Sequence, residues 1–271
     1  MTFSNPSMAP AFRRLHEHGL LVLANAWDAG TARLIESLGA KAIATTSAAV
    51  AWSHGYADGD FLPVPLLEAT VAGIVRVVGV PVSVDVEGGY SDDGTAVGET
   101  VGRLINAGAV GINIEDGAGD PDLLCAKIAA VRRAAARHQV DLFVNARTDV
   151  YLRGLAAPDR RVDETVARAA RYRTAGADGI FVPGVVEAAE IKTIASAVQM
   201  PLNVLALLGL PSAPELEKLG ARRLSAGSGV AQSVYGRIAS LSKAFLRTGD
   251  SAPLGEGAMV YAEINALMAS R

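Results

Sequence analysis

The stretch PVSVDVE at residues 81–87 is the first of three in which an apolar run ends in charged residues. The stretches VGINIED at residues 110–116 and LFVNARTD at residues 142–149 repeat this pattern. Each apolar run is typical of a strand that is buried on both faces. The charged residues therefore follow neighbouring strands at the same end of a parallel sheet, where α/β barrels build their active sites. The pattern predicts a metal-dependent enzyme that acts on a small anionic substrate.

Strand and helix patterns alternate along the whole chain of 271 residues. Glycines at positions 39, 108, 176 and 220 each end a helix just before the next strand. Eight such units predict an α/β fold of the (βα)8 TIM-barrel class, which commonly needs about 250 residues. A doubly wound open sheet is the alternative, but Asn25-Ala26-Trp27-Asp28 stands where its glycine-rich loop would follow the first strand. The strands are expected at residues 20–24, 41–45, 81–84, 110–114, 142–146, 179–182, 202–206 and 223–226.

A single barrel domain is expected to span residues 1–271. A helical extension from about residue 229 could pack on a neighbouring subunit. Residues 46–62 are expected to form a long polar loop, because prolines at positions 63 and 65 open the helix that follows.

Composition excludes several classes of function. The net charge is -3 with no basic tract, so neither nucleic-acid nor membrane-surface binding is expected. Cys125 is the only cysteine, so no intramolecular disulfide can form, which fits a reducing cytoplasm. Its place in the pattern of a helix indicates a buried helical residue. No signal peptide or membrane-spanning stretch is visible. His16, His18 and His138 have the pattern of helix-surface residues, and His54 in the long loop could reach the site.

Five carboxylates are expected on adjacent loops at one end of the barrel. Two carboxylates about 5 Å apart repel by roughly 3 kcal/mol at an effective dielectric of 20, so a cluster needs a cation or a shared proton. All-oxygen ligation favours Mg²⁺ or Mn²⁺ over zinc, and magnesium keeps several waters. Asp85 is the first candidate for a direct ligand, although a loop aspartate can instead cap the next helix. The five residues are Asp58, Asp85, Glu87, Glu115 and Asp116.

Arg147 and the turn after the second strand are the candidate anion-binding groups. A guanidinium at a strand end can hold a substrate carboxylate in two hydrogen bonds. The alternative for Arg147 is an internal ion pair with Asp149 or Glu115, and both roles can hold if Glu115 orients the arginine. Successive amides after Thr45 could hold an anionic oxygen, or they could simply form a turn.

Six strings in the chain, in this order and spacing, resemble the phosphoenolpyruvate mutase/isocitrate lyase superfamily over about residues 10–240. They are Ala24-Asn25-Ala26-Trp27-Asp28-Ala29-Gly30, Thr45-Thr46-Ser47-Ala48-Ala49-Val50, Gly55-Tyr56-Ala57-Asp58, Asp85-Val86-Glu87-Gly88-Gly89-Tyr90, Ile114-Glu115-Asp116 and Asn145-Ala146-Arg147-Thr148-Asp149.

This resemblance implies Mg²⁺ held directly by Asp85, with Asp58, Glu87 and Glu115 arranged around its waters. It also implies that Arg147 binds the carboxylate of a 2-oxo acid, and that the amides of Thr46, Ser47 and Ala48 hold the oxyanion. The chemistry would pass through an enolate. The last helix would be swapped between paired subunits of a homotetramer, a dimer of dimers.

The chain departs from the superfamily pattern in three places. Glu87 stands where aspartate is usual. The lysine, cysteine, glycine and histidine string of the isocitrate lyases is missing, so Cys125 does not inherit its catalytic role. Only Gly117–Asp120 remains of the long gating loop, which makes mutase chemistry harder to protect from water. The arginine-containing residues 151–161 are the alternative cover for the site.

Three functions stay open from the sequence. The leading hypothesis is a Mg²⁺-dependent carbon–carbon lyase or decarboxylase of a small 2-oxo or 2-hydroxy dicarboxylate. The alternatives are a phosphoenolpyruvate mutase or phosphonopyruvate hydrolase, and a non-catalytic 2-oxo acid binding protein. Glu115, His54 and a metal-bound water are the candidate proton donors for the first.

Overall fold

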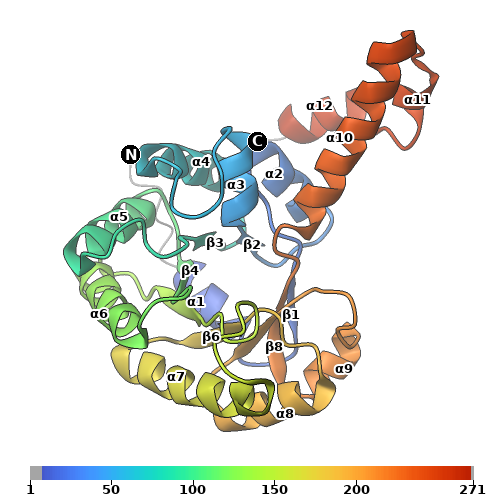
Figure 1. Cartoon of the computed structure of the whole chain (residues 1–271). Helices are drawn as coiled ribbons and strands as arrows, with labels where there is room; N and C mark the ends of the chain where they lie inside the picture. Colours follow the sequence, from blue (N-terminus) through green and yellow to red (C-terminus); the bar gives the residue numbers. More distant parts are fainter. Residues whose placement is uncertain (1–7, 270–271) are drawn as a thin grey trace.

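The computed structural model describes residues 8–269, and their strands form one closed ring (Figure 1). The eight strands are all parallel and lie in the order β1-β8-β7-β6-β5-β4-β3-β2. A parallel bridge between Ala26 and Thr45 joins the two ends of this order, with the Ala26 amide donating to the Ala44 carbonyl at 2.8 Å. The predicted (βα)8 barrel is therefore confirmed. The strands are β1 (Leu21–Leu23), β2 (Ile43–Ala44), β3 (Val82–Asp85), β4 (Gly111–Glu115), β5 (Phe143–Arg147), β6 (Gly179–Val182), β7 (Leu202–Leu205) and β8 (Ala221–Ser225).

Helices follow the strands and surround the barrel (Figure 1). Their starts carry ordinary cap chemistry: the Asp120 side chain accepts from the Asp122 amide at 2.9 Å, with Pro121 in the first turn. The helices are α1 (Met8–Arg14), α2 (Ala29–Ser37), α3 (Ser47–Ser53), α4 (Val64–Val77), α5 (Gly94–Asn106), α6 (Pro121–Arg137), the short η1 (Pro158–Arg160), α7 (Arg161–Ala175), α8 (Ala188–Ala197), α9 (Ala213–Lys218), α10 (Gly229–Thr248), α11 (Ala252–Gly255) and α12 (Tyr261–Ala269). None of the helices described in residues 8–269 is long and apolar enough to cross a membrane.

The prediction of a continuous polar loop over residues 46–62 was wrong in its first half. Ser47–Ser53 forms α3, and residues 47–51 are buried. Small apolar side chains let this short helix pack close to the barrel mouth, so tertiary packing overrides the loop reading. Only residues 54–62 remain as an exposed loop, with Leu62 buried at its end.

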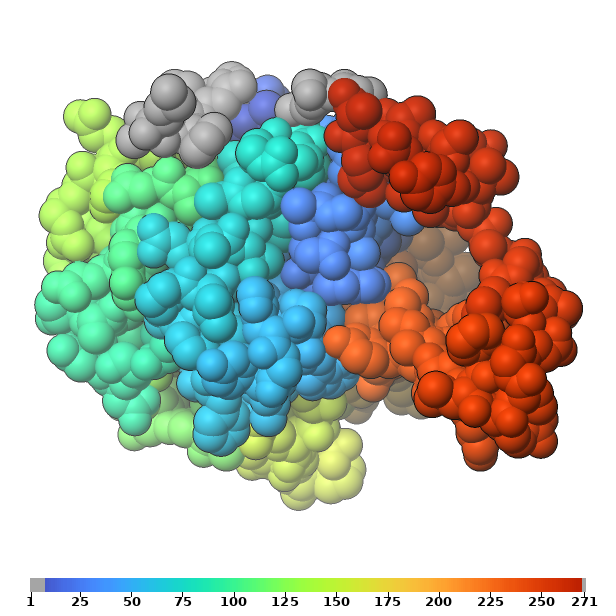
Figure 2. All heavy atoms as spheres, turned by 90° about the horizontal axis from the view of Figure 1, so that it is seen from above, coloured from blue at the N-terminus to red at the C-terminus, as the bar shows by residue number. Residues whose placement is uncertain are grey.

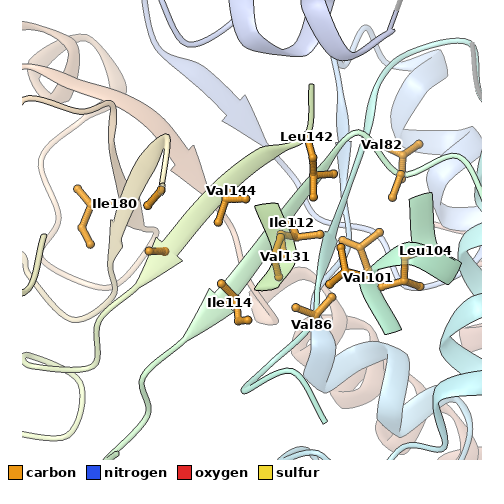
Figure 3. Packing of buried hydrophobic residues seen from close by; sticks show 14 of the residues in the cluster. Val82, Val86, Val101, Leu104, Ile112, Ile114, Val131, Leu142, Val144 and Ile180 are labelled. Atoms are coloured by element: carbon orange, nitrogen blue, oxygen red, sulfur yellow. The ribbon is translucent and has the colours of Figure 1, made fainter. Parts of the chain in front are cut away.

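The main hydrophobic core lies between the barrel wall and the helices (Figure 3). Val82, Ile112, Val144 and Ile180 come from β3, β4, β5 and β6. Figure 3 shows the first three near Val101 and Leu104 of α5 and Val131 of α6. A second cluster closes the amino-terminal end of the barrel. Its members include Phe12 from α1, Leu21, Leu23 and Phe143.

His16 belongs to this closed end, so its assignment to the helix surface was wrong. Only 3% of the residue is exposed, and its ring stacks on Phe143 with the centroids 4.1 Å apart. Its Nδ1 lies 2.9 Å from the Phe12 carbonyl oxygen, an acceptor, so Nδ1 carries the proton. Burial lowers the pKa of His16 to about 3, and the charge of Arg223 acts in the same direction.

The carboxyl-terminal helices form an arm that stands off the barrel (Figure 2). Helix α10 leads away from β8, and the α12 end returns to α2, where Arg33 Nε donates to the Leu267 carbonyl at 3.3 Å. Near its start, α10 touches the barrel through Tyr235, whose ring meets Trp52 edge-on at 6.0 Å. The helix after β8 would normally cover the outer face of β1. That face is exposed to solvent here, since Val22 on β1 is 53% exposed.

Candidate active site

Asp85 ends β3 and is fixed by the loop that follows β2. Its amide donates to Thr45 Oγ1 at 2.8 Å, and its carboxylate Oδ2 accepts from the Ser47 amide at 3.3 Å. The aspartate therefore does not cap the helix after its own strand. That cap is Asp93, whose side chain accepts from the Thr95 amide. Asp85 is left at the barrel mouth, where the sequence predicted a metal ligand.

Arg147 lies beside Glu115 across the neighbouring strands β5 and β4, where the two residues are register partners. Arg147 Nη1 is 2.6 Å from Glu115 Oε2. Its other edge binds Asp149 through two hydrogen bonds, Nε at 2.7 Å and Nη2 at 3.0 Å. Both ion pairs that the sequence left open are thus present together. Because each terminal nitrogen carries a second N–H group, both keep a donor that can bind an anion.

Asp116 does not join the ring of acids, contrary to expectation. Its carboxylate accepts from the Tyr172 hydroxyl at 2.6 Å, the Thr148 hydroxyl at 2.8 Å and Arg168 Nη1 at 2.9 Å. These partners lie on or next to α7 and β5, so Asp116 locks the end of β4 to its surroundings. The alternation of side chains along a strand explains the split, because it turns Asp116 away from the face that Glu115 occupies.

Glu87 holds two loops together. Its Oε2 accepts from the Gly59 amide at 2.7 Å and from the Asp60 amide, and its Oε1 accepts from the Tyr90 hydroxyl at 3.0 Å. The backbone is unusual here, since Glu87, Asp60 and Tyr90 all have positive φ, of 51°, 63° and 61°. Such conformations persist when surrounding contacts enforce them and often occur at functional sites. A carboxylate has about four lone-pair positions, so one remains on Oε1 for a further donor.

Asp58 is carried by the exposed loop that Glu87 anchors. Partial burial of its carboxyl group raises the pKa of Asp58, and the charge of Asp85 adds to the shift, while a hydrogen bond from the Ser47 side chain opposes it. The electrostatic influence of Asp85 places Asp58 within reach of the same centre. Tyr90 belongs to the string that begins at Asp85, but no local pattern in the sequence indicates that Asp60 and Tyr90 organise this loop through contacts between residues far apart in the chain.

Burial and the neighbouring carboxylates both disfavour negative charge on Glu115. Burial raises the pKa of Glu115 to about 8; Arg147 opposes this shift, and Asp85, Asp149 and Asp58 add to it. Within residues 8–269, no three side chains of His, Cys, Asp or Glu converge closely enough to enclose a metal ion by themselves. Magnesium fits such an arrangement, since it usually takes one or two carboxylates and completes its shell with water.

The amides expected to bind an oxyanion are not equivalent. The Thr46 amide donates to the Ala26 carbonyl at 3.2 Å, within the contact that closes the barrel. The Ser47 amide faces Asp85, as described above, and Ala48 begins the same turn of α3. All three residues are buried at the barrel mouth.

Two other sequence candidates lie outside the centre. His54 Nε2 is 2.9 Å from Thr70 Oγ1, on the exposed side of α4. Cys125 is partly buried on α6, and burial raises the pKa of its thiol. Residues 116–120 are the whole connection between β4 and α6, as the short gating loop predicted.

Together, the barrel and its mouth define an enzyme class in which carboxylates and one arginine gather at the carboxyl ends of parallel strands. Within that class, the chain belongs to the phosphoenolpyruvate phosphomutase family, whose sequence model matches residues 12–246. The predicted superfamily is therefore confirmed. It includes enzymes that act on carbon–carbon and on carbon–phosphorus bonds.

Two curated relatives each match more than two thirds of the chain. The uncharacterized protein Rv1998c of Mycobacterium tuberculosis is 38% identical over 223 residues, which cover 80% of this chain and 82% of that protein. The oxaloacetate decarboxylase of Paraburkholderia xenovorans is 32% identical over 200 residues, covering 69% of this chain and 64% of the decarboxylase.

Solved structures share the same fold. A protein of Burkholderia cenocepacia J2315, named as a candidate phosphonomutase, is 41% identical with a TM-score of 0.83, covering 88% of this chain and 99% of that one. A phosphonopyruvate hydrolase solved with oxalate and Mg²⁺ is 21% identical with a TM-score of 0.82, covering 100% and 96%, so its likeness concerns the fold alone.

Proposed function

We propose that this chain is a Mg²⁺-dependent carbon–carbon lyase that cleaves a small 2-oxo or 2-hydroxy dicarboxylate through an enolate. The observation that carries the proposal is the position of Arg147. Its guanidinium is fixed by Glu115 and Asp149 and keeps donors for an anion near Asp85. A cation site beside an oriented arginine can bind both ends of the 2-oxo acid group.

Asp85 is the proposed direct ligand, with Asp58, Glu115 and Glu87 contacting the metal through water. Mn²⁺, which accepts the same oxygen ligands, is expected to substitute for Mg²⁺. The metal, when bound, would supply positive charge near the 2-oxo oxygen, where negative charge develops. Glu87 can take part only through its remaining lone pair on Oε1, because its other positions accept from the Gly59 and Asp60 amides and from the Tyr90 hydroxyl.

The protein groups suggest an order of events for a 2-oxo diacid. Arg147 binds the carboxylate next to the oxo group, and the Ala48 amide is the proposed donor to the oxo oxygen, joined by the Ser47 amide if its 3.3 Å contact with Asp85 is released. The bond to the departing carboxyl carbon breaks, and its electron pair moves into the enolate as CO₂ leaves. Glu115 is the proposed donor of a proton to the enolate carbon, from Oε1, since Oε2 faces Arg147.

A substrate panel tests this proposal. The purified protein is incubated with Mg²⁺ and a set of 2-oxo and 2-hydroxy diacids, and the released oxo acid is measured. Release from at least one diacid, abolished by a chelator and restored by Mg²⁺, is expected. Absence of product from every member would refute the lyase.

Phosphonate chemistry is the second candidate, and the family match favours it. A phosphoenolpyruvate mutase or phosphonopyruvate hydrolase would use the same oxo-acid site. The short connection at residues 116–120 argues against it, because little chain is available there to exclude water. Phosphorus NMR of phosphonopyruvate incubated with the protein distinguishes the two, since conversion is expected only for the phosphonate enzyme.

We also propose that the arm of α10 to α12 packs on a second copy of the chain, in a dimer of dimers located in the cytoplasm. Val22 leaves an apolar face of β1 exposed, and the arm also exposes apolar side chains. Contact between the arm of one copy and the β1 face of another would bury both apolar surfaces. The exposed apolar residues include Ile238, Phe245 and Leu246. Light scattering on Ile238→Glu and Phe245→Glu tests this: smaller assemblies than wild type are expected, and an unchanged mass would contradict it.

A further inference from the structure

Arg223 is a fully buried arginine inside the barrel, outside the site described above. It lies on β8 with 1% of its surface exposed. Its register partners are Leu21 on β1 and Asn203 on β7. Leu21 belongs to the cluster that closes the amino-terminal end of the barrel, and register partners in parallel strands share a face. Arg223 therefore points into the barrel interior, and its neighbour Arg222 points outward.

A chain of hydrogen bonds fixes the orientation of the polar groups around Arg223. Arg223 Nε donates to Ser225 Oγ at 3.2 Å, and Ser225 Oγ donates to Asn203 Oδ1 at 3.2 Å. The carbonyl oxygen of Asn203 thus accepts from Ser225, which leaves only its amide nitrogen for a further hydrogen bond. Among the described residues, Arg223 Nη1, Arg223 Nη2 and Asn203 Nδ2 are all buried without a hydrogen-bond partner.

These three nitrogens are donors only, and one of them belongs to a cation. Burial lowers the pKa of Arg223 to about 10, so the guanidinium remains charged at neutral pH. The carboxylate that acts on it is Asp85, at the mouth of the barrel. His16 below is neutral, as its pKa shows, and supplies no negative charge. A buried charge normally has a paired opposite charge, and buried donors normally have acceptors.

We propose that Arg223 and Asn203 form an interior binding site for a small monovalent inorganic anion of the size of chloride. An anion would supply at once the acceptor that all three nitrogens need and the opposite charge that the guanidinium needs. Water would supply the acceptor without the charge. The ligand must be small, because Arg223 and Asn203 are each only 1% exposed inside the closed barrel. This site goes beyond the proposed lyase activity and does not depend on it.

Bromide provides the direct structural probe. Crystals of the full-length protein are soaked in sodium bromide, and anomalous scattering locates the halide. A bromide peak within hydrogen-bond distance of the Arg223 terminal nitrogens and Asn203 Nδ2 is expected. An ordered water at that position, without anomalous signal, overturns the proposal.

Thermal unfolding in chloride and in gluconate at equal ionic strength provides the solution test, because gluconate is too large for the site. For the wild type, Tm should rise by roughly 2–4 °C for each tenfold increase in chloride above its Kd. The matched control Arg222→Met, which alters the outward-facing neighbour, should keep this dependence. Arg223→Met should lose it.

Asn203→Asp decides the matter if Arg223→Met fails to fold. The new carboxylate would stand beside Arg223 as a built-in anion. This variant should have a higher Tm than wild type in gluconate and should respond to chloride by less than 1 °C, on the order of the change that distant substitutions produce. A chloride response equal to that of wild type would contradict the proposed site.

Discussion

Arg147 Nη1 lies 2.6 Å from Glu115 Oε2, and the two residues are register partners on adjacent barrel strands. Asp149 holds the opposite edge of the same guanidinium. The arginine is therefore held in one orientation before any substrate arrives, which reduces the ordering required on binding.

Arg147→Lys tests the carboxylate-binding role. Lysine keeps the charge but cannot make the paired hydrogen bonds of a guanidinium. Loss of a hydrogen bond to a charged group costs about 1.5–3 kcal/mol, so kcat/KM should fall roughly 10- to 150-fold. The matched control is Arg153→Lys, since Arg153 also contacts Asp149, at 2.9 Å, but is half exposed. Equal losses in both variants would show that Asp149 pairing, and not substrate binding, is being measured.

Asp85→Asn tests the metal site without relying on turnover. The proposed direct ligand loses its charge, so the affinity for Mn²⁺, measured by electron paramagnetic resonance, should fall at least tenfold, on the order of one lost charge-assisted contact. Asp93→Asn serves as the control, because Asp93 caps α5 on the same loop. Retention of wild-type Mn²⁺ affinity by Asp85→Asn would exclude direct ligation by this residue.

Glu87→Gln tests the contact between the two loops. A neutral acceptor binds the Gly59 and Asp60 amides more weakly, so hydrogen exchange of these amides should accelerate roughly tenfold, as expected for loss of about 1.4 kcal/mol. KM should rise with it, because the same loop carries Asp58. Glu99→Gln on the exposed side of α5 is the control. Unchanged exchange at both amides would contradict the anchoring role.

Because His16 is buried as a neutral side chain, we expect the free energy of unfolding to decrease at acid pH. The pKa of His16 is about 3 in the folded protein, against 6.5 in the unfolded chain. Burial and the charges of Arg223 and Arg13 oppose protonation, and the hydrogen bond to the Phe12 carbonyl and the charge of Asp178 favour it less strongly. Below pH 6.5 the unfolded state binds more protons, so stability is complete above this pH and falls by about 1.4 kcal/mol per unit towards pH 3.

Chemical denaturation between pH 7 and 4 measures this decrease in the free energy of unfolding. His16→Gln should flatten the decline, and His18→Asn, which changes an exposed histidine, should not. A decline of the same slope in His16→Gln would assign the acid sensitivity to other groups.

The barrel could be predicted because glycine junctions and apolar runs are local signals, and the strand-end positions of Asp85, Glu115 and Arg147 followed from them. Side-chain alternation in β4 could also have separated Glu115 from Asp116, and the spacing of four between Phe12 and His16 could have indicated a shared buried face. The anchoring of residues 59–60 by Glu87 could not be predicted, because it depends on positive φ values and on contacts between distant loops.

The most direct test of the central claim is the rate at which oxaloacetate, the simplest 2-oxo diacid of the panel, yields pyruvate with the wild-type protein and Mg²⁺. Because Mg²⁺ alone accelerates this decarboxylation, Asp85→Asn at the same concentration is the reference. The account predicts a protein-dependent rate that saturates with substrate, disappears with chelator and falls to the reference rate in Asp85→Asn. A wild-type rate equal to that of Asp85→Asn, with oxaloacetate and with every other diacid of the panel, would contradict it.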